Sequence, residues 1–156
     1  MIKRVLNKLF RETYRVTHPF LWFHHTQVNG VPSIGDPHRL TVGNHVSFNG
    51  NSYIQCAGGV KIGSYVTISY GVTILTAGLK ADGYPDTCMC PMREHIFAPV
   101  SIGDGVWLCA NSMVMPGVSI APRIIVAAGS VVTKDLDREG WLYAGIPAKP
   151  IKPLSK

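Results

Sequence analysis

Apolar residues recur at every sixth position through the second half of the chain. The first set of these positions holds Ile102, Leu108, Val114, Ile120, Val126 and Val132, and a second set, four residues later, holds Val106, Ser112, Val118, Ile124 and Ser130. An α-helix repeats at 3.6 residues and a strand at two, so a sustained period of six fits neither alone. It fits a chain that turns a corner at every sixth residue, so that three sides close a coil of eighteen residues. Stacked coils then bury a narrow aliphatic core.

The same pattern extends toward the N-terminus with two interruptions. It is present at Val42, Phe48 and Ile54, slips by two residues around 57–59, and resumes at Ile62, Ile68 and Ile74. Between 76 and 99 it disappears, and this segment contains glycines, prolines, two cysteines and His95. Long segments without a pattern inside a compact domain are often functional loops, so 76–99 is predicted to be extruded from a corner of the coil.

The first thirty residues follow a different pattern. Residues 2–17 alternate apolar and basic positions at helical spacing, and Pro19 ends the predicted helix. An aromatic patch follows at 20–25. The helix either covers the open end of the coil stack or makes a weak contact with an anionic membrane surface. We therefore divide the chain into an N-terminal helix with its aromatic linker, 1–29, and a coil domain, 30–156.

Composition adds an oligomer and an anionic partner to this picture. Apolar residues make up 46% of the 156-residue chain and charged residues only 15%, which suggests that other subunits cover part of the surface. The net charge is +6, typical of a protein that meets a nucleic acid, an acidic membrane or a phosphorylated cofactor. No basic stretch is interleaved with aromatic residues, so we expect no nucleic acid partner.

The four cysteines, at 56, 88, 90 and 109, match neither a zinc knuckle nor a redox hairpin in their spacing. The N-terminus lacks the apolar core of a signal peptide, and no apolar run is long enough to cross a membrane. We expect a reduced, cytoplasmic protein without a metal.

Three motifs give the repeat a family resemblance. IGDGVW at 102–107, VVTK at 131–134 and YAGIPAK at 143–149 together resemble the hexapeptide-repeat acyltransferases, in particular the galactoside and maltose acetyltransferases and the O-acetyltransferases of surface polysaccharides. The likeness covers about 30–153. It implies an all-β fold, a left-handed parallel β-helix with a short N-terminal helix and a long extruded loop. It also implies a homotrimer, acetyl-CoA as the donor and a sugar or glycan as the acceptor.

The resemblance further implies which residues border the cofactor. By position, Trp107 matches the aromatic residue at the groove between subunits and Ala110 the small residue beside the pantetheine. Ala128, Thr133 and Lys134 match other groove residues, and Lys152 matches a basic residue that meets the phosphates. Small side chains, free peptide groups and ammonium groups suit such a ligand.

The catalytic base is where this sequence departs from the family. Attack by a hydroxyl on a thioester needs a base, and imidazole titrates in the useful range. The family's histidine falls sixteen residues after Gly63, where this chain has Leu79. Asn49 matches the asparagine that accompanies the histidine in the family.

Two accounts of Leu79 stay open. In the first, His95, the only histidine of the loop, replaces the missing base, Asn49 orients it or the acceptor, and Arg93 and Glu94 hold it or meet the acceptor. In the second, catalysis is lost and the chain binds only CoA or a sugar. The γ-class carbonic anhydrases share the repeat, but the spacing of His38, His45 and His95 does not resemble their zinc ligands. The predicted function is transfer of an acetyl group from acetyl-CoA to a sugar hydroxyl in surface polysaccharide synthesis.

Overall fold

The computed structural model describes Leu9, Thr13 and residues 25–155. Leu9 and Thr13 are helical, and the Thr13 hydroxyl donates a hydrogen bond to the Leu9 carbonyl at 2.9 Å. The rest of the helix predicted for 2–17, its proposed membrane contact and residues 20–24 of the aromatic patch lie outside the described residues. Among the described residues, no helix is long and apolar enough to cross a membrane.

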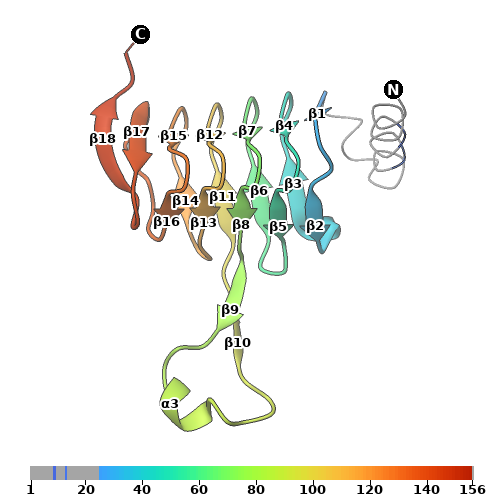
Figure 1. The fold of residues 1–156 in the computed structure, drawn as a ribbon, viewed down its shortest axis with the longest axis vertical. Helices are drawn as coiled ribbons and strands as arrows, with labels where there is room; N and C mark the ends of the chain where they lie inside the picture. Colours follow the sequence, from blue (N-terminus) through green and yellow to red (C-terminus); the bar gives the residue numbers. More distant parts are fainter. Residues whose placement is uncertain (1–8, 10–12, 14–24, 156) are drawn as a thin grey trace.

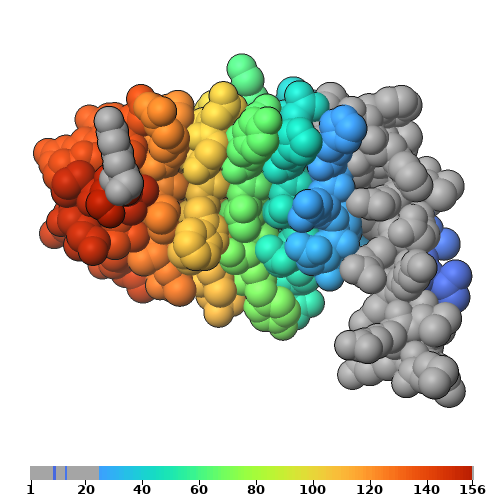
Figure 2. Space-filling model, turned by 90° about the horizontal axis from the view of Figure 1, so that it is seen from above, coloured from blue at the N-terminus to red at the C-terminus, as the bar shows by residue number. Residues whose placement is uncertain are grey.

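Parallel strands stack into three sheets, which we call faces A, B and C, and each coil passes through them in that order (Figure 1). Face A contains β1 (Gln27–Val28), β4 (Ser47–Phe48), β7 (Thr67–Ile68), β12 (Trp107–Leu108), β15 (Ile125–Val126), β17 (Trp141–Ala144) and β18 (Lys149–Pro153). Face B contains β2 (Ser33–Gly35), β5 (Tyr53–Gln55), β8 (Thr73–Ile74), β13 (Met113–Val114) and β16 (Val131–Val132). Face C contains β3 (Leu40–Val42), β6 (Val60–Ile62), β11 (Val100–Ile102) and β14 (Ser119–Ile120). In the space-filling view the coils appear as successive bands of colour (Figure 2). The predicted all-β fold, a parallel β-helix, is confirmed.

The core is the set of residues that the sixfold period selects. Phe48, Ile68, Leu108 and Val126 occupy equivalent positions on successive strands of face A, and each is fully buried. All the other positions of the two predicted sets between 102 and 132 are also buried, including Ser112 and Ser130. Their hydroxyl groups lie at corners, where the Ser112 hydroxyl donates to the Cys109 carbonyl at 2.8 Å and the Ser130 hydroxyl accepts from the Gly145 amide at 3.0 Å. The core therefore tolerates small polar residues only where a backbone partner is at hand.

Coil length differs between the two halves of the stack. The C-terminal coils have the predicted eighteen residues, as in the pairing of Ile102 with Ile120. The N-terminal coils have twenty, as in the pairing of Val42 with Ile62. The two extra residues lie at the B–C corner, where the sequence pattern slips by two residues around 57–59.

The extruded loop is a hairpin that projects from the B–C corner (Figure 1). It contains β9 (Ala77–Leu79), α3 (Tyr84–Thr87) and β10 (His95–Phe97), and β9 pairs with β10 antiparallel. At its base, the buried Thr76 carbonyl accepts a hydrogen bond from the Ala98 amide at 2.9 Å. The Gln55 side chain accepts bonds from the Thr76 and Ala77 amides at 3.2 and 3.0 Å. These bonds close the base of the hairpin and hold its first strand against the stack, as the loop prediction required.

The last two strands end the stack. β17 continues face A in parallel with β15, and β18 turns back antiparallel to β17. Two prolines, Pro150 and Pro153, lie in β18, where they remove backbone donors from the outer edge. These two strands lie at the C-terminal end of the coils (Figure 1).

Candidate active site

His95 lies directly across the hairpin from Leu79, the position of the missing base. Their Cα atoms are partners in the β9–β10 register. Two other pairs of the hairpin are hydrogen-bonded. The Lys80 amide donates to the Glu94 carbonyl at 3.0 Å, one pair away, and the Ala98 amide donates to the Thr76 carbonyl, three pairs away in the other direction. In an antiparallel ladder the bonded pairs alternate, so Leu79 and His95 form a non-bonded pair, whose side chains approach most closely and share one face. The imidazole therefore projects from the same side of the hairpin as a side chain at 79.

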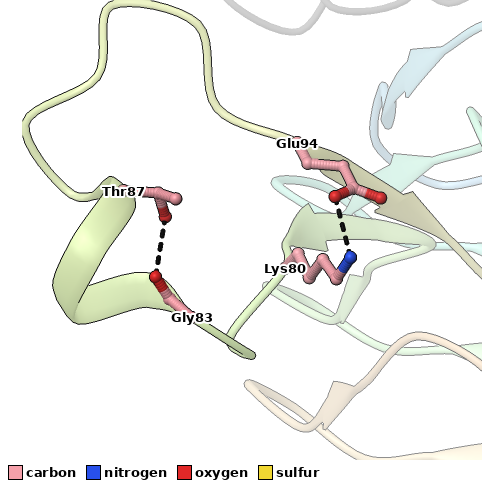
Figure 3. Close-up of polar contacts among 4 residues, drawn as sticks. All are labelled: Lys80, Gly83, Thr87 and Glu94. Carbon is pink, nitrogen blue, oxygen red and sulfur yellow. Dashed lines mark hydrogen bonds and ion pairs between the residues drawn. The ribbon is translucent and has the colours of Figure 1, made fainter.

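The two faces of the hairpin carry different chemistry. The His95 and Phe97 rings lie on one face, with centroids 6.4 Å apart, and both side chains are exposed. On the other face, the Lys80 ammonium and the Glu94 carboxylate form an ion pair at 2.9 Å (Figure 3). Glu94 therefore lies on the opposite face of the hairpin from His95 and pairs with Lys80. Arg93 donates to the Tyr84 hydroxyl at 3.4 Å, farther out along the hairpin.

A pocket of about 450 Å³ lies at the base of the hairpin on the face of Phe97. It is lined by Asp36, His38, Arg39, Ala57, Gly58 and Phe97. The first three come from the short turn η1 (Pro37–Arg39) and its preceding residue, and the Arg39 guanidinium is anchored to the Ala57 carbonyl at 2.8 Å. Sequence reasoning missed this pocket. The three polar residues Asp36, His38 and Arg39, which lie within four positions just after Ile34, were a usable signal of a binding site.

Asn49 lies at a different corner from the hairpin. It follows β4 at the A–B corner, where its amide group donates to the Ile68 carbonyl at 3.0 Å and accepts from Asn29 at 3.3 Å. The hairpin leaves from the B–C corner. One chain therefore does not bring Asn49 and His95 together, and face B separates them.

Four of the six predicted cofactor residues lie along face A and its edge with face B. Trp107 is in register with Ile125, then Leu142, then Lys152, so a row of four side chains crosses four strands, about 14 Å from end to end. The Trp107 indole donates to the Ser69 hydroxyl at 2.9 Å, which fixes its orientation while leaving the ring 46% exposed.

Ala110 and Ala128 lie one coil apart at the A–B corner, beside this row. The Ala110 carbonyl accepts the Gly129 amide at 3.0 Å, but within the described part of the chain the amides of Ala110 and Ala128 donate to no protein acceptor. An added Cβ at Gly129 would meet nothing within 4 Å. Two available N–H groups beside open space fit an extended arm that carries amide carbonyls, as pantetheine does.

Thr133 and Lys134 lie at the B–C corner instead. They follow β16 and share this corner with the start of the hairpin two coils earlier, since Val132 stacks through Val114 onto Ile74. The predicted cofactor residues thus form two groups on opposite edges of face B.

The two thiols of the coil stack, on Cys56 and Cys109, do not supply a nucleophile. Burial, with a smaller effect from the Asp36 carboxylate, raises the pKa of Cys56 to about 11, and burial also raises the pKa of Cys109. Both are therefore protonated at neutral pH, and a protonated thiol is a poor nucleophile. Over residues 25–155, with Leu9 and Thr13, no three side chains of His, Cys, Asp or Glu are grouped as metal ligands would be.

Comparison with known proteins agrees with the repeat. Residues 99–134 match the family described as "Bacterial transferase hexapeptide (six repeats)". The chain is 31% identical over 97 residues to the galactoside O-acetyltransferase of Escherichia coli, a match that covers 62% of this chain and 45% of that enzyme. The chain spans about half the length of the curated relatives that it matches.

Two solved structures extend the likeness to three dimensions. A maltose O-acetyltransferase from Clostridium difficile superposes with a TM-score of 0.73 at 25% identity, covering 84% of this chain and 67% of that one. A hexapeptide-repeat acetyltransferase from Vibrio cholerae, solved with acetyl coenzyme A, gives 0.68 at 26% identity over 88% of this chain and 75% of that one. The chain therefore carries the bacterial transferase hexapeptide repeat over residues 99–134 and is similar in sequence and fold to these hexapeptide-repeat acetyltransferases.

Proposed function

We propose that this protein transfers an acetyl group from acetyl-CoA to a hydroxyl of a sugar, in the synthesis of a surface polysaccharide. The observation that carries the proposal is the register of the hairpin, which sets His95 opposite Leu79 on one face. A base supplied from β10 can then serve the place that a base from β9 serves in the family. The galactoside and maltose acetyltransferases among the relatives support a sugar acceptor.

The active site is completed by a neighbouring subunit in this proposal. The outward side chains of face C are Thr41, Lys61, Ser101 and Ser119, whereas those at the equivalent positions of face B are Ser33, Tyr53, Thr73, Met113 and Val131. The less polar face B suits the axis of a trimer. The A–B corner of one subunit would then meet the B–C corner and hairpin of the next, joining the two groups of cofactor residues and bringing Asn49 toward His95.

His95 acts as the general base in this arrangement. It takes the proton from the acceptor hydroxyl while the oxygen forms its bond to the acetyl carbonyl carbon. A backbone N–H group at the groove between subunits stabilises the negative charge that develops on the carbonyl oxygen. The C–S bond then breaks, and the proton held by His95 passes to the leaving thiolate.

The pocket at the hairpin base is the candidate site for the acceptor. Its carboxylate, guanidinium and imidazole, on Asp36, Arg39 and His38, can exchange hydrogen bonds with several sugar hydroxyls. The Phe97 ring offers an apolar wall next to His95. A sugar held there presents a hydroxyl on the face of the hairpin that carries the proposed base.

The test is release of CoA thiol from acetyl-CoA with a panel of sugars, comparing wild type with His95→Ala. We expect the variant to lose about 10²–10⁴-fold in turnover, with CoA binding unchanged. Ile96→Ala is the matched control, because Ile96 is the next residue of the same strand and faces the other side; it should retain activity within about twofold. Full turnover by His95→Ala would refute His95 as the base.

The second candidate is a catalytically silent relative that binds CoA or a sugar. The specific observation in its favour is Leu79 itself, whose side chain cannot accept a proton. Leu79→His separates the two functions. Turnover that appears only in this variant would mean that the wild-type chain is a binding protein.

A further inference from the structure

A ladder of stacked rings runs along the C–A corner, away from the proposed active site. The His25 and His45 rings have centroids 5.2 Å apart and planes 11° apart, and His45 and Tyr65 are 5.0 Å and 16° apart. Each residue has a positive φ, of 49°, 57° and 60° in turn, which turns its side chain out from the same point of successive coils. The ladder therefore continues wherever a later coil places a side chain at this point.

The next coil places none there. The Tyr65 amide bonds to the Asn44 carbonyl, the Gly105 amide to Ser64 and the Arg123 amide to Asp104, each at 2.8 Å. Because they share this hydrogen-bond pattern, Gly105 and Arg123 occupy the next two positions of the ladder, which we call rungs. Their φ values, 66° and 57°, are positive like those of the three ring residues. Gly105 is thus a rung without a side chain, between the Tyr65 ring and the Arg123 side chain.

The missing rung leaves a cavity of about 400 Å³. It is lined by Tyr65, Asp104, Gly105, Pro122, Arg123 and Glu139. Adjacent rungs are about 5 Å apart, so Tyr65 and Arg123 are separated by about 10 Å at their backbones, enough for one flat ring in contact with both. The Arg123 side chain forms the wall of the cavity opposite Tyr65. It lies close to the empty position, since an added Cβ at Gly105 would be 3.6 Å from the Arg123 Cγ atom.

The chemistry of the walls selects a flat ring with an amino group. Tyr65 is 67% exposed and offers its π-face, and the Arg123 guanidinium is held in an ion pair with Glu139. Phenol rings and guanidinium planes are both surfaces on which nucleobases stack. At the edge of the cavity, Asp104 Oδ1 accepts the Ser64 amide at 2.7 Å, while its Oδ2 has no partner among the described residues. A free carboxylate oxygen accepts a hydrogen bond from an exocyclic amine.

We propose that the gap at Gly105 binds the adenine ring of a nucleoside or nucleotide, sandwiched between Tyr65 and Arg123 with its amino group on Asp104. This site lies at the C–A corner, whereas the residues assigned to acetyl transfer lie at the other two corners and on face A. The proposal is therefore independent of the proposed function.

The experiment is a titration of the full-length protein with adenosine, followed by NMR of the tyrosine rings and by calorimetry. We expect saturable binding that shifts the Tyr65 ring signals, and at least tenfold weaker binding of uridine, which lacks the amine. Gly105→His fills the gap with a ring at a φ that His45 already adopts, and it should bind adenosine at least tenfold more weakly. Gly83→Asn is the matched control, because Gly83 also has a positive φ, of 70°, and open space around it, but lies in the hairpin; its affinity should equal that of wild type.

Two further measurements keep the result interpretable. Tyr65→Ala removes an exposed ring from the surface and should also weaken adenosine binding at least tenfold, so it decides the question if Gly105→His fails to fold. Coenzyme A also carries adenine, and its affinity should be the same in wild type and Gly105→His if the two sites are distinct. Absence of adenosine binding at millimolar concentration, unchanged binding in Gly105→His or Tyr65→Ala, or a parallel loss of coenzyme A binding in Gly105→His would overturn the proposal.

Discussion

The coil stack and the hairpin are built on opposite principles. In the stack, each position of the sixfold period has a fixed role, and the inward side chains from Val42 to Val132 are at most 6% exposed. In the hairpin, the residues of β9 are half-buried, those of β10 are exposed, and Met89 and Met92 near the tip are each 92% exposed. Local stability follows buried apolar area, so the stack should hold the stability of the protein and the hairpin its chemistry.

The same contrast appears in the polar contacts. Stack corners are joined by backbone bonds between coils, and a side chain such as Asp104 completes them with a bond to the Ser64 amide. Beyond its base, the hairpin relies on one short ladder, the Lys80–Glu94 ion pair and the turn of α3, where the Thr87 hydroxyl donates to the Gly83 carbonyl at 3.1 Å (Figure 3). Changes of equal size should therefore have unequal effects in the two regions.

The largest difference is expected for the same substitution made in each region. Ile62→Ala removes a side chain that is 1% exposed in face C, and it should lower the free energy of unfolding by about 2–5 kcal/mol because it leaves a cavity. Ile96→Ala in the hairpin removes a side chain that is 44% exposed and should cost less than about 1 kcal/mol. Urea unfolding at one fixed protein concentration measures both. Equal costs would show that the hairpin folds as part of the core.

An intermediate difference is expected between two cysteines as the pH rises. The pKa of the buried Cys56 thiol, about 11, lies above that of an unfolded thiol, so the unfolded chain ionises first. The contribution to stability is complete below about pH 9 and is lost as the pH rises toward 11, amounting to about 3 kcal/mol. Cys56→Ala should remove this part of the alkaline decline in thermal unfolding experiments.

The control for this prediction is Cys90→Ala, which removes an exposed thiol from the hairpin and should leave the alkaline decline of wild type intact. If Cys56→Ala declines as steeply as wild type, the Cys56 thiol does not contribute to the pH dependence.

The smallest effect is expected for the hairpin ion pair. The Lys80 and Glu94 side chains are 44% and 67% exposed, so solvent and salt screen their attraction. Glu94→Gln should change the free energy of unfolding by less than about 0.5 kcal/mol, and a double-mutant cycle with Lys80→Gln should give a similarly small coupling. A coupling above about 1 kcal/mol would mean that the pair organises the hairpin, and would weaken the contrast between the two regions.

The coil stack could be predicted because the sixfold pattern in the sequence is also the set of side chains whose burial stabilises the fold. A buried side chain at every sixth residue is both the pattern and the cause of the fold, so Leu108 or Val126 could be placed from the sequence alone. The two-residue slip near 57–59 was visible as well, but its effect on coil length was not, because a slip alone does not say whether the extra residues bulge or lengthen a coil.

The site could be predicted only in pieces. Trp107 and Lys152 were named one by one through the family resemblance, but the row that joins them depends on strand pairings across β15, β17 and β18. The facing of His95 and Leu79 depends on a hairpin register that no periodic pattern fixes. The missing rung at Gly105 was also hidden, because a glycine at a corner has an ordinary explanation until the neighbouring coils show rings at the same point.

The B–C corner gives this protein a place to accept foreign sequence. Counted between the inward residues of faces B and C, three lengths of connection already occur there, across 55–61, 75–101 and 115–119. The strands that they join keep one register, with Val60 beside Val100 and Ile102 beside Ile120. The bond from Ala98 to Thr76 closes the longest connection before its variable part begins. Because doubling a flexible loop costs only about 0.6 kcal/mol in closure entropy, peptides grafted between Leu79 and His95 should be displayed at little cost to folding. Evolution within such a scaffold can therefore change specificity by exchanging one insert, without altering a single core residue.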